Sequence, residues 1–272
     1  MVHDERPIGV FDSGLGGLTV VRALLDLLPA EHLVYFGDTG RFPYGPKPPD
    51  EVLKFALEIT DLLVAREIKM IVVACNSASA VALEQLEQRV DVPVVGVIEP
   101  GLRAAARVTS SRRVGVIGTV GTIGSGAYQR VAARIDAGLE LTCAACPGFV
   151  EFVEAGDVES DQVHVLAERL LAPVRQACVD TLVLGCTHYP LLRPLIEQAV
   201  PETMRVIDSA ESAAETATRL FNGRAKSPCA GSENQPTEIH CFATDSVEKF
   251  ERLGSRFLGR PVGNVQLVDL GG

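Results

Sequence analysis

The sequence contains no tryptophan, only four tyrosines and no cluster of basic residues. Its net charge is −10, and the one adjacent basic pair is Arg112 and Arg113. A protein that binds nucleic acid usually presents a basic face with aromatic platforms on which bases stack. The composition therefore argues against a nucleic-acid partner.

Long apolar runs and low-complexity tracts are also missing. No stretch approaches the roughly 20 apolar residues that cross a bilayer, so we expect no membrane-spanning segment. The first ten residues include Asp4 and Glu5 and no apolar run, so we expect no secretory signal and a cytoplasmic location. With 272 residues, 47% of them hydrophobic, the chain can form two globular domains, each with its own core.

The chain has seven cysteines, and an odd number in a reducing compartment favours free thiols over a disulfide framework. Cys143 and Cys146 have C-x-x-C spacing. A structural zinc site needs a second pair of ligands at similar spacing, which the sequence lacks. A redox motif would open a helix, whereas Cys143 falls within a predicted strand. We therefore expect structural roles for both and no bound metal.

Short apolar runs alternate with helical patterns along most of the chain. Strands that are apolar along their whole length are typical of parallel sheets covered by helices on both faces. The predicted strands are residues 8–11, 32–38, 71–74, 92–98, 113–119, 139–145, 181–185 and 205–208. The predicted helices are residues 18–28, 50–67, 78–90 and 127–135, one starting at residue 161 and one after Pro190.

This pattern occurs twice. A shift of 111 residues superimposes residues 50–75 on 161–186 without a gap and places Cys75 on Cys186. A second shift, of 106, pairs "IGVFDS" with "VGVIGT". We predict an α/β fold of two pseudo-symmetric, doubly wound domains with mainly parallel sheets and an active site in the cleft between them.

The first domain would comprise residues 1–98 and the second residues 99–209. The boundary would fall at Glu99 and Pro100, where proline ends a strand. In the tail, residues 222–236 are polar and predict a loop, and residues 237–242 and 264–270 predict strands with a helix over 247–257 between them. We expect residues 210–272 to return to the first domain.

Cys75 and Cys186 each stand at the end of a predicted strand, before a helix. Ligands of open α/β sheets bind beyond these strand ends, and a helix N-terminus lowers a cysteine pKa toward neutrality. The alternative is that both are small buried residues capping strands. Their matched positions, each followed by polar residues, favour a function. If both thiols face one cleft, one can remove a proton from a carbon centre while the other delivers a proton to the opposite face.

Such an inversion would proceed without a cofactor. Lys47 and Lys69 stand in no motif that suggests a pyridoxal Schiff base. A dinucleotide fingerprint would need glycine at Thr19. The site would instead stabilise a carbanion by positioned hydrogen bonds in a water-poor cleft.

Other motif residues each allow two interpretations. The turn "DSGLGG" places Asp12 and Ser13 where backbone N–H groups suit an anion, or Asp12 caps a helix. Thr119 and Thr122 could hold a charged group of the substrate or cap a helix. His188 could pair with a thiol or the substrate, or have no role.

Two further segments are equally open. Pro43, Tyr44 and Gly45 form a stiff loop that could be a ligand wall or only a turn. Glu154 is by itself indistinguishable from a surface carboxylate.

Together, "GVFDSGLGG", "FGDTGRFPYG", "VVACNSAS", "GVIGT" and "LVLGCTHYPLL" resemble the glutamate racemases of the cofactor-independent aspartate/glutamate racemase superfamily. The resemblance extends to about Arg219. It implies interconversion of L- and D-glutamate without a cofactor, supply of D-glutamate for peptidoglycan, and a homodimer.

The resemblance also implies residue roles. Cys75 would take the proton from D-glutamate with help from Asp12, and Cys186 would take it from L-glutamate with help from Glu154 and His188. The positions where the family holds substrate are Asp12, Ser13, Tyr44, Gly45, Asn76, Ser77, Thr187 and His188; Pro43, Thr119, Thr122 and the two cysteines complete the predicted binding site. Ser77 stands where the family more often has threonine, and it keeps the hydroxyl.

Two alternatives stay open. One is a racemase of aspartate or another small carboxylate. The other, from a different class, is a binding protein that captures an anionic amino acid without chemistry.

Overall fold

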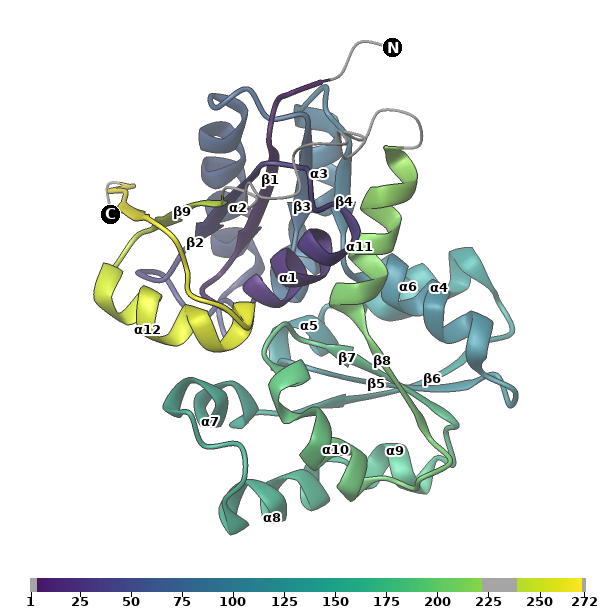
Figure 1. The fold of residues 1–272 in the computed structure, drawn as a ribbon. Coiled ribbons are helices and arrows are strands. Elements are labelled where there is room, and N and C mark those ends of the chain that lie inside the picture. The colour runs from purple at the N-terminus through teal and green to yellow at the C-terminus, as the bar shows by residue number, and fades with distance from the viewer. Residues whose placement is uncertain (1–3, 222–238, 271–272) are drawn as a thin grey trace.

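The computed structural model describes residues 4–221 and 239–270. These residues form two parallel sheets with helices on both faces (Figure 1), so the predicted α/β fold with parallel sheets is confirmed. The loop predicted over 222–236, and the first two residues of the strand predicted over 237–242, lie outside the described residues.

The first sheet combines strands from both ends of the chain. Its strands, in spatial order, are β10 (Val265–Leu267), β9 (Ile239–Ala243), β2 (Leu33–Gly37), β1 (Ile8–Asp12), β3 (Met70–Val73) and β4 (Val94–Gly96). All neighbours pair in parallel. The two C-terminal strands extend the sheet beyond β2, where they pair with the N-terminal part of the chain. The domain boundaries themselves stay a prediction.

The second sheet repeats the order of β2, β1, β3 and β4 in the first. Its strands are β6 (Glu140–Ala145), β5 (Arg113–Gly118), β7 (Thr181–Gly185) and β8 (Arg205–Asp208). Val10 pairs with Val72 in the first sheet, and Val116 pairs with Val183 in the second. These pairs differ by the same 106 and 111 residues as the sequence repeat, so the repeat preserves strand register as well as strand order.

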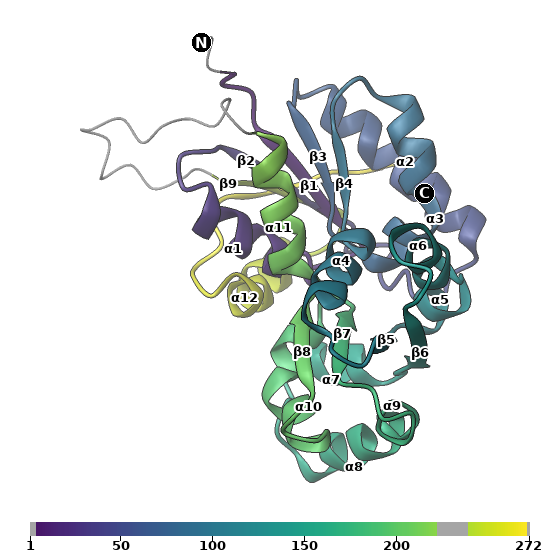
Figure 2. The same ribbon diagram turned by 90° about the vertical axis from the view of Figure 1, so that its right-hand side faces the viewer.

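Helices cover both faces of the first sheet (Figures 1 and 2). They are α2 (Pro49–Val64) and α3 (Asn76–Arg89) on one face, and α1 (Leu18–Leu27), α11 (Ser209–Leu220) and α12 (Val247–Leu258) on the other. In β1, Ile8 and Val10 pack with the α1 side, whereas Phe11 packs with the α2 side. Because successive side chains point to opposite faces and both faces are buried, residues 8–11 of the strand are all apolar.

The second sheet is covered in the same way. On one face lie α4 (Ile98–Val108) and α6 (Ala127–Ile135), and on the other α8 (Asp161–Leu170), α9 (Ala172–Gln176) and α10 (Arg193–Ala199). Three short helices follow strand ends: α5 (Val120–Gly124), α7 (Phe149–Ala155) and the 3-10 helix η1 (Tyr189–Leu192).

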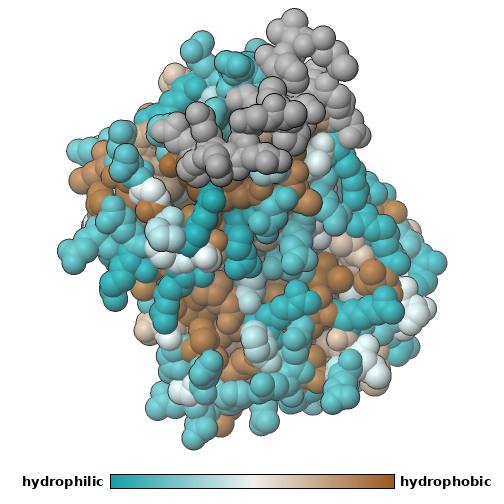
Figure 3. Space-filling model, viewed as in Figure 1, coloured by the Kyte–Doolittle hydropathy of each residue, from teal (hydrophilic) through white to brown (hydrophobic). Residues whose placement is uncertain are grey.

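Two features of the outer surface complete the fold. On the face shown in Figure 3, hydrophilic side chains separate the hydrophobic groups, as expected where a surface meets water. Within the described residues, no helix combines the length and the apolar character that crossing a bilayer requires.

Several predicted elements are wrong in their extent, among them the strand predicted over 264–270, which covers only Val265–Leu267. The strand predicted over 92–98 covers only Val94–Gly96, and α4 begins at Ile98. Pro100 therefore lies in the first turn of a helix, where its missing N–H breaks no helical hydrogen bond. The helix predicted from residue 161 is divided into α8 and α9, whereas its counterpart α2 is continuous. The second piece begins at Ala172, and Pro173 lies in its first turn, because proline cannot continue the hydrogen bonds of the first piece.

Candidate active site

A small pocket lies between the two sheets, at the carboxyl ends of their central strands. The residues that line it are Ser13, Phe42, Pro43, Tyr44, Gly45, Cys75, Asn76, Ser77, Thr119, Val150, Cys186, Thr187 and His188. The space open to the centre of a water molecule is about 20 Å3, enough for one ordered water. Asp12, Thr122 and Glu154, also predicted from the sequence, stand behind this wall and bond to residues that form it.

Cys75 follows β3 and is the N-cap residue of α3. Its thiol is buried and donates to Ser13 Oγ at 3.7 Å. The predicted lowering of its pKa is wrong: burial, together with the negative charge of Asp12, raises the pKa of Cys75 to about 12. The helix N–H of Ala78 acts in the predicted direction, but it does not offset removal of the thiolate from water.

Cys186 follows β7 at the matching position. The turn after it leads into the 3-10 helix η1, with the Tyr189 N–H bonded to the Cys186 carbonyl at 3.1 Å. Burial raises the pKa of Cys186 as well, and the charges of Cys75 and Asp12 raise it further. The two thiols are thus close enough that ionisation of one opposes ionisation of the other.

Asp12 ends β1 and is fully buried. Its carboxylate accepts the Gly14 N–H at 3.0 Å and the Thr187 hydroxyl, from the second sheet, at 3.3 Å. Burial raises the pKa of Asp12, although the nearby charge of His188 acts to lower it. The N-cap residue of α1 is Gly17, so Asp12 holds the glycine-rich turn instead of capping the helix.

His188 and Glu154 form an acid/base pair beside Cys186. His188 Nε2 lies 2.9 Å from Glu154 Oε1, and the two side chains are 3% and 15% exposed. The imidazole packs against two aromatic rings, Phe42 at 5.7 Å and Phe257 at 5.1 Å between centroids. Sequence reasoning missed both rings, because neither is close to His188 in the chain.

Three hydroxyl groups meet where the two halves touch. Ser77 Oγ lies 3.1 Å from both Thr119 Oγ1 and Thr122 Oγ1. Thr119 also accepts the Thr122 N–H at the start of α5. The helix-capping interpretation of Thr119 is therefore correct, and the same hydroxyl also belongs to the pocket wall.

Asn76 presents an amide to the pocket. Its Oδ1 accepts the Tyr128 hydroxyl at 2.9 Å. Its Nδ2 is buried and has no hydrogen-bond partner among the described residues. A buried amide donor is costly to leave unpaired, so this group is suited to a ligand oxygen.

The loop that carries Tyr44 is anchored by residues that the sequence analysis did not identify. Tyr44 donates its hydroxyl to Asp38, which also accepts from Arg41 at 2.7 Å and from Thr244 at 2.8 Å. Asp38 and Arg41 belong to the quoted motif "FGDTGRFPYG", so the motif itself pointed to the residues that anchor the loop. The loop also reaches the second half, where the Gly45 carbonyl accepts the Gly121 N–H at 2.9 Å.

The remaining candidate residues lie outside the pocket. Cys143 is within β6 as predicted, and burial raises its pKa to about 11 and that of Cys146 to about 12. Lys69, immediately before β3, is buried in an ion pair with Glu31 at the opposite end of that strand from Cys75. Among the described residues, no three His, Cys, Asp or Glu side chains gather in a way that could hold a metal ion.

Comparison with known proteins gives a consistent result. The family model Asp/Glu/Hydantoin racemase matches residues 8–217. A glutamate racemase of Geobacter metallireducens is 48% identical over 269 residues, 97% of each chain. The structure of glutamate racemase isoform RacE1 from Bacillus anthracis has a TM-score of 0.92 and 39% identity, covering 98% of this chain and 99% of that one. Glutamate racemase from Francisella tularensis, solved in complex with D-glutamate, has a TM-score of 0.89 and 33% identity over 98% of each chain.

Proposed function

This chain belongs to the Asp/Glu/hydantoin racemase family and is an isomerase, and we propose that it interconverts L- and D-glutamate by two-base proton transfer at Cα. The observation that carries the proposal is the pair Cys75 and Cys186, which occupy matched strand ends in two repeated sheets and line one pocket. The D-glutamate bound to the Francisella tularensis relative supports glutamate as the substrate.

In the proposed reaction each cysteine serves one face of the substrate. The Cys75 thiolate takes the Cα proton of D-glutamate, and the Cys186 thiol gives its proton to the opposite face of the resulting carbanion. One proton leaves carbon and one reaches it, so the product is L-glutamate and the two thiols have exchanged states. The reverse reaction begins with the Cys186 thiolate.

The raised thiol pKa values suit this chemistry. A thiolate whose conjugate acid has a pKa near 12 is a stronger base toward a weakly acidic Cα–H than an ordinary thiolate. The positive ammonium of the substrate would favour the thiolate once it is bound. Because ionisation of one thiol opposes ionisation of the other, the pocket disfavours two thiolates together, so a thiolate formed on one side leaves a thiol on the other, as the mechanism requires.

The flanking groups support different roles on the two sides. We assign Asp12 to assist Cys75, whose pKa its charge raises. We assign His188 and Glu154 to assist Cys186, since the backbone N–H of His188 interacts with that sulfur and the His188 imidazole bonds to Glu154.

Neutral donors would receive the substrate. Among the described residues, the pocket lining includes no lysine or arginine. The Asn76 amide and the hydroxyls of Ser77, Thr119 and Thr122 are the groups that we assign to the carboxylates. Ser13, Pro43, Tyr44, Gly45 and Thr187 complete the proposed binding wall. Positioned hydrogen bonds in so small a pocket would stabilise the carbanion.

Incubation with L-glutamate in D2O tests the proposal. Proton NMR should show loss of the Cα–H signal, and chiral chromatography should show D-glutamate accumulating to equal amounts. A protein that only binds the amino acid would leave the Cα–H signal intact, and this result would overturn the proposal. A parallel incubation with L-aspartate separates the glutamate assignment from the aspartate alternative.

We further propose that the product supplies peptidoglycan synthesis, that the chain acts in the cytoplasm and that it forms a homodimer. The six described cysteines are free thiols, which suits a reducing compartment. Rescue of a D-glutamate-requiring bacterium by the gene tests the first point. Light scattering tests the third, for which a mass equal to one chain would be a contrary result.

A further inference from the structure

The C-terminal helix α12 reaches from the first sheet to the acid/base pair of the second. Its apolar face packs on α1 and β10. A Cβ on Gly254 would lie 3.0 Å from Leu18, so α12 and α1 are in close contact. Arg256 and Phe257 lie in the last turn of α12, and Figure 1 shows α12 beside α7.

Phe257 contacts the His188 ring directly. Its side chain is 2% exposed, and the two rings meet edge to face at 74°. Phe42 stacks on the same imidazole at 28°. Gly16 Cα also lies against the ring, since a Cβ there would be 2.5 Å from His188 Nδ1. His188 comes from the second half of the molecule, yet all three of these neighbours belong to elements of the first.

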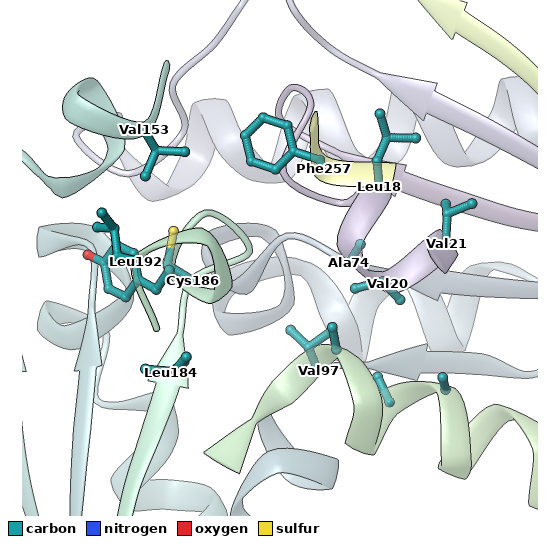
Figure 4. Close-up of a cluster of buried hydrophobic side chains, with 14 of the residues drawn as sticks. Leu18, Val20, Val21, Ala74, Val97, Val153, Leu184, Cys186, Leu192 and Phe257 are labelled. Carbon is teal, nitrogen blue, oxygen red and sulfur yellow. The ribbon is translucent and has the colours of Figure 1, made fainter. Parts of the chain in front are cut away.

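The neighbouring residue Arg256 contacts the helix that carries Glu154. A Cβ on Gly156 would lie 2.1 Å from Arg256 Nη1, so the guanidinium rests on the end of α7. A positive charge at a helix C-terminus is favourable. Figure 4 shows Phe257 pointing from α12 toward the side on which Val153 of α7 lies, and both belong to one apolar cluster with Cys186.

We infer that Phe257 is a positioning residue that holds the His188 imidazole against Glu154, and that α12 thereby controls proton transfer on the Cys186 side. This inference rests on the proposed racemisation. Three contacts surround the imidazole: Phe257 meets it edge to face, Phe42 stacks on it, and its Nε2 bonds to Glu154. Together they leave the imidazole one orientation. Without the Phe257 ring the imidazole can tilt, and the hydrogen bond to Glu154 loses its alignment.

Phe257→Leu tests the inference, because leucine keeps apolar bulk and removes the flat ring. We expect kcat/KM to fall about tenfold, less than the 10²–10⁴ of a whole acid/base group. The fall must be equal in both directions, since the two enantiomers have equal free energy. The rate alone therefore does not reveal which thiol is affected.

Deuterium at Cα separates the two sides. Proton removal from L-glutamate uses Cys186, so slowing this step should enlarge the isotope effect on kcat/KM for L-[2-2H]glutamate. Proton removal from D-glutamate uses Cys75. In the variant the later step at Cys186 limits the rate more, and removal of the Cα deuteron by Cys75 limits it less. The isotope effect for D-[2-2H]glutamate should therefore shrink. A general loss of packing would not shift the two isotope effects in opposite directions.

Leu258→Ala is the matched control, because Leu258 is equally buried at 2% on the same helix. It should lower the thermal midpoint and leave both isotope effects unchanged. Phe257→Leu should also have little additional effect in a His188→Gln background, since both changes act on the same group. If Phe257→Leu does not fold, Phe257→Met is measured in its place.

The outcomes separate the two proposals. Wild-type isotope effects in the folded Phe257 variant, or equal changes for both enantiomers, would overturn the positioning role alone. Failure of the wild-type protein to exchange Cα–H would overturn the proposed function itself.

Discussion

At the scale of single residues, the two thiols gain their chemical character from burial more than from the helix ends beside them. Cys75 is 5% exposed and Cys186 is 7% exposed. Loss of water around a thiolate raises the pKa, and the few N–H groups nearby restore only part of that solvation. A cysteine at a strand end is thus a stronger base here than its position in the sequence predicts.

Replacement of either thiol tests which enantiomer each cysteine deprotonates. Cys75→Ser and Cys186→Ser should each lower racemisation in both directions by about 10²–10⁴-fold, because a hydroxyl is far too weak an acid to act as the second group. Each variant should keep one-base elimination from a suitable glutamate analogue of one enantiomer: D for Cys186→Ser, and L for Cys75→Ser. The same enantiomer preference in both variants, or racemisation near the wild-type rate in either, would contradict the two-thiol mechanism.

Stability should fall at alkaline pH for the same reason. The folded Cys75 thiol keeps its proton to about pH 12, whereas the unfolded one loses it near 9.0. The resulting stabilisation is complete below pH 9 and is lost as pH rises toward 12. Urea unfolding should therefore show that the free energy of unfolding falls more steeply with pH for wild type than for Cys75→Ala. Between pH 9 and pH 12 the difference in slope should be about 1.4 kcal/mol per pH unit for one proton. Parallel curves would show that this thiol titrates normally in the folded state.

At the scale of elements, the glycine-rich turn before α1 lets the two halves approach each other. A Cβ on Gly16 would lie 2.3 Å from Thr187 Oγ1 as well as close to His188. Glycine is thus needed at this position because any side chain would collide with Thr187 and His188 of the other half.

Gly16→Ala should displace Thr187 and His188 and lower kcat about 10²-fold, because displacements near 1 Å can cost that much. Gly124→Ala is the control, since no atom lies within 4 Å of the added Cβ. It should leave activity unchanged and stabilise α5 slightly, because alanine favours helix. Steady-state kinetics and thermal unfolding of both variants check this. Equal kinetics in the two variants would contradict the close approach.

The elements that could be predicted are those whose signal is local. The apolar runs predicted strands β1 to β8, and the repeat placed Cys75 and Cys186 at matched strand ends. The start of α4 was missed because Pro100 ends a strand and begins a helix equally well. The hydrogen bond between Glu154 and His188 could not be predicted from the residue pattern, because it joins two residues of the second half that lie 34 residues apart in the chain. The contact of Phe257 with His188 could not be predicted because it depends on packing between the two halves.

At the scale of the whole molecule, both thiols line one small pocket that contacts between the two halves keep closed. The loop bond from Gly45 to Gly121 and the hydroxyl contacts of Ser77 join the two halves over a pocket that admits about one water. A pocket for a small-molecule ligand typically has a volume of about 300–1,000 Å3. Glutamate can therefore enter only when the halves separate or the loops move, and the same motion exposes both sulfurs.

Alkylation with iodoacetamide measures this shared motion. Among the cysteines that the structure describes, Cys178 is exposed and should react first. Cys75 and Cys186 should react much more slowly, because both are buried, and at pH 8 a thiol with a pKa near 12 has a thiolate fraction about a thousandfold below that of an ordinary thiol. Saturating glutamate should slow both buried cysteines together and leave Cys178 unchanged, as read by mass spectrometry of the peptides. Protection of only one buried cysteine would show that one motion of the halves or loops does not expose both thiols.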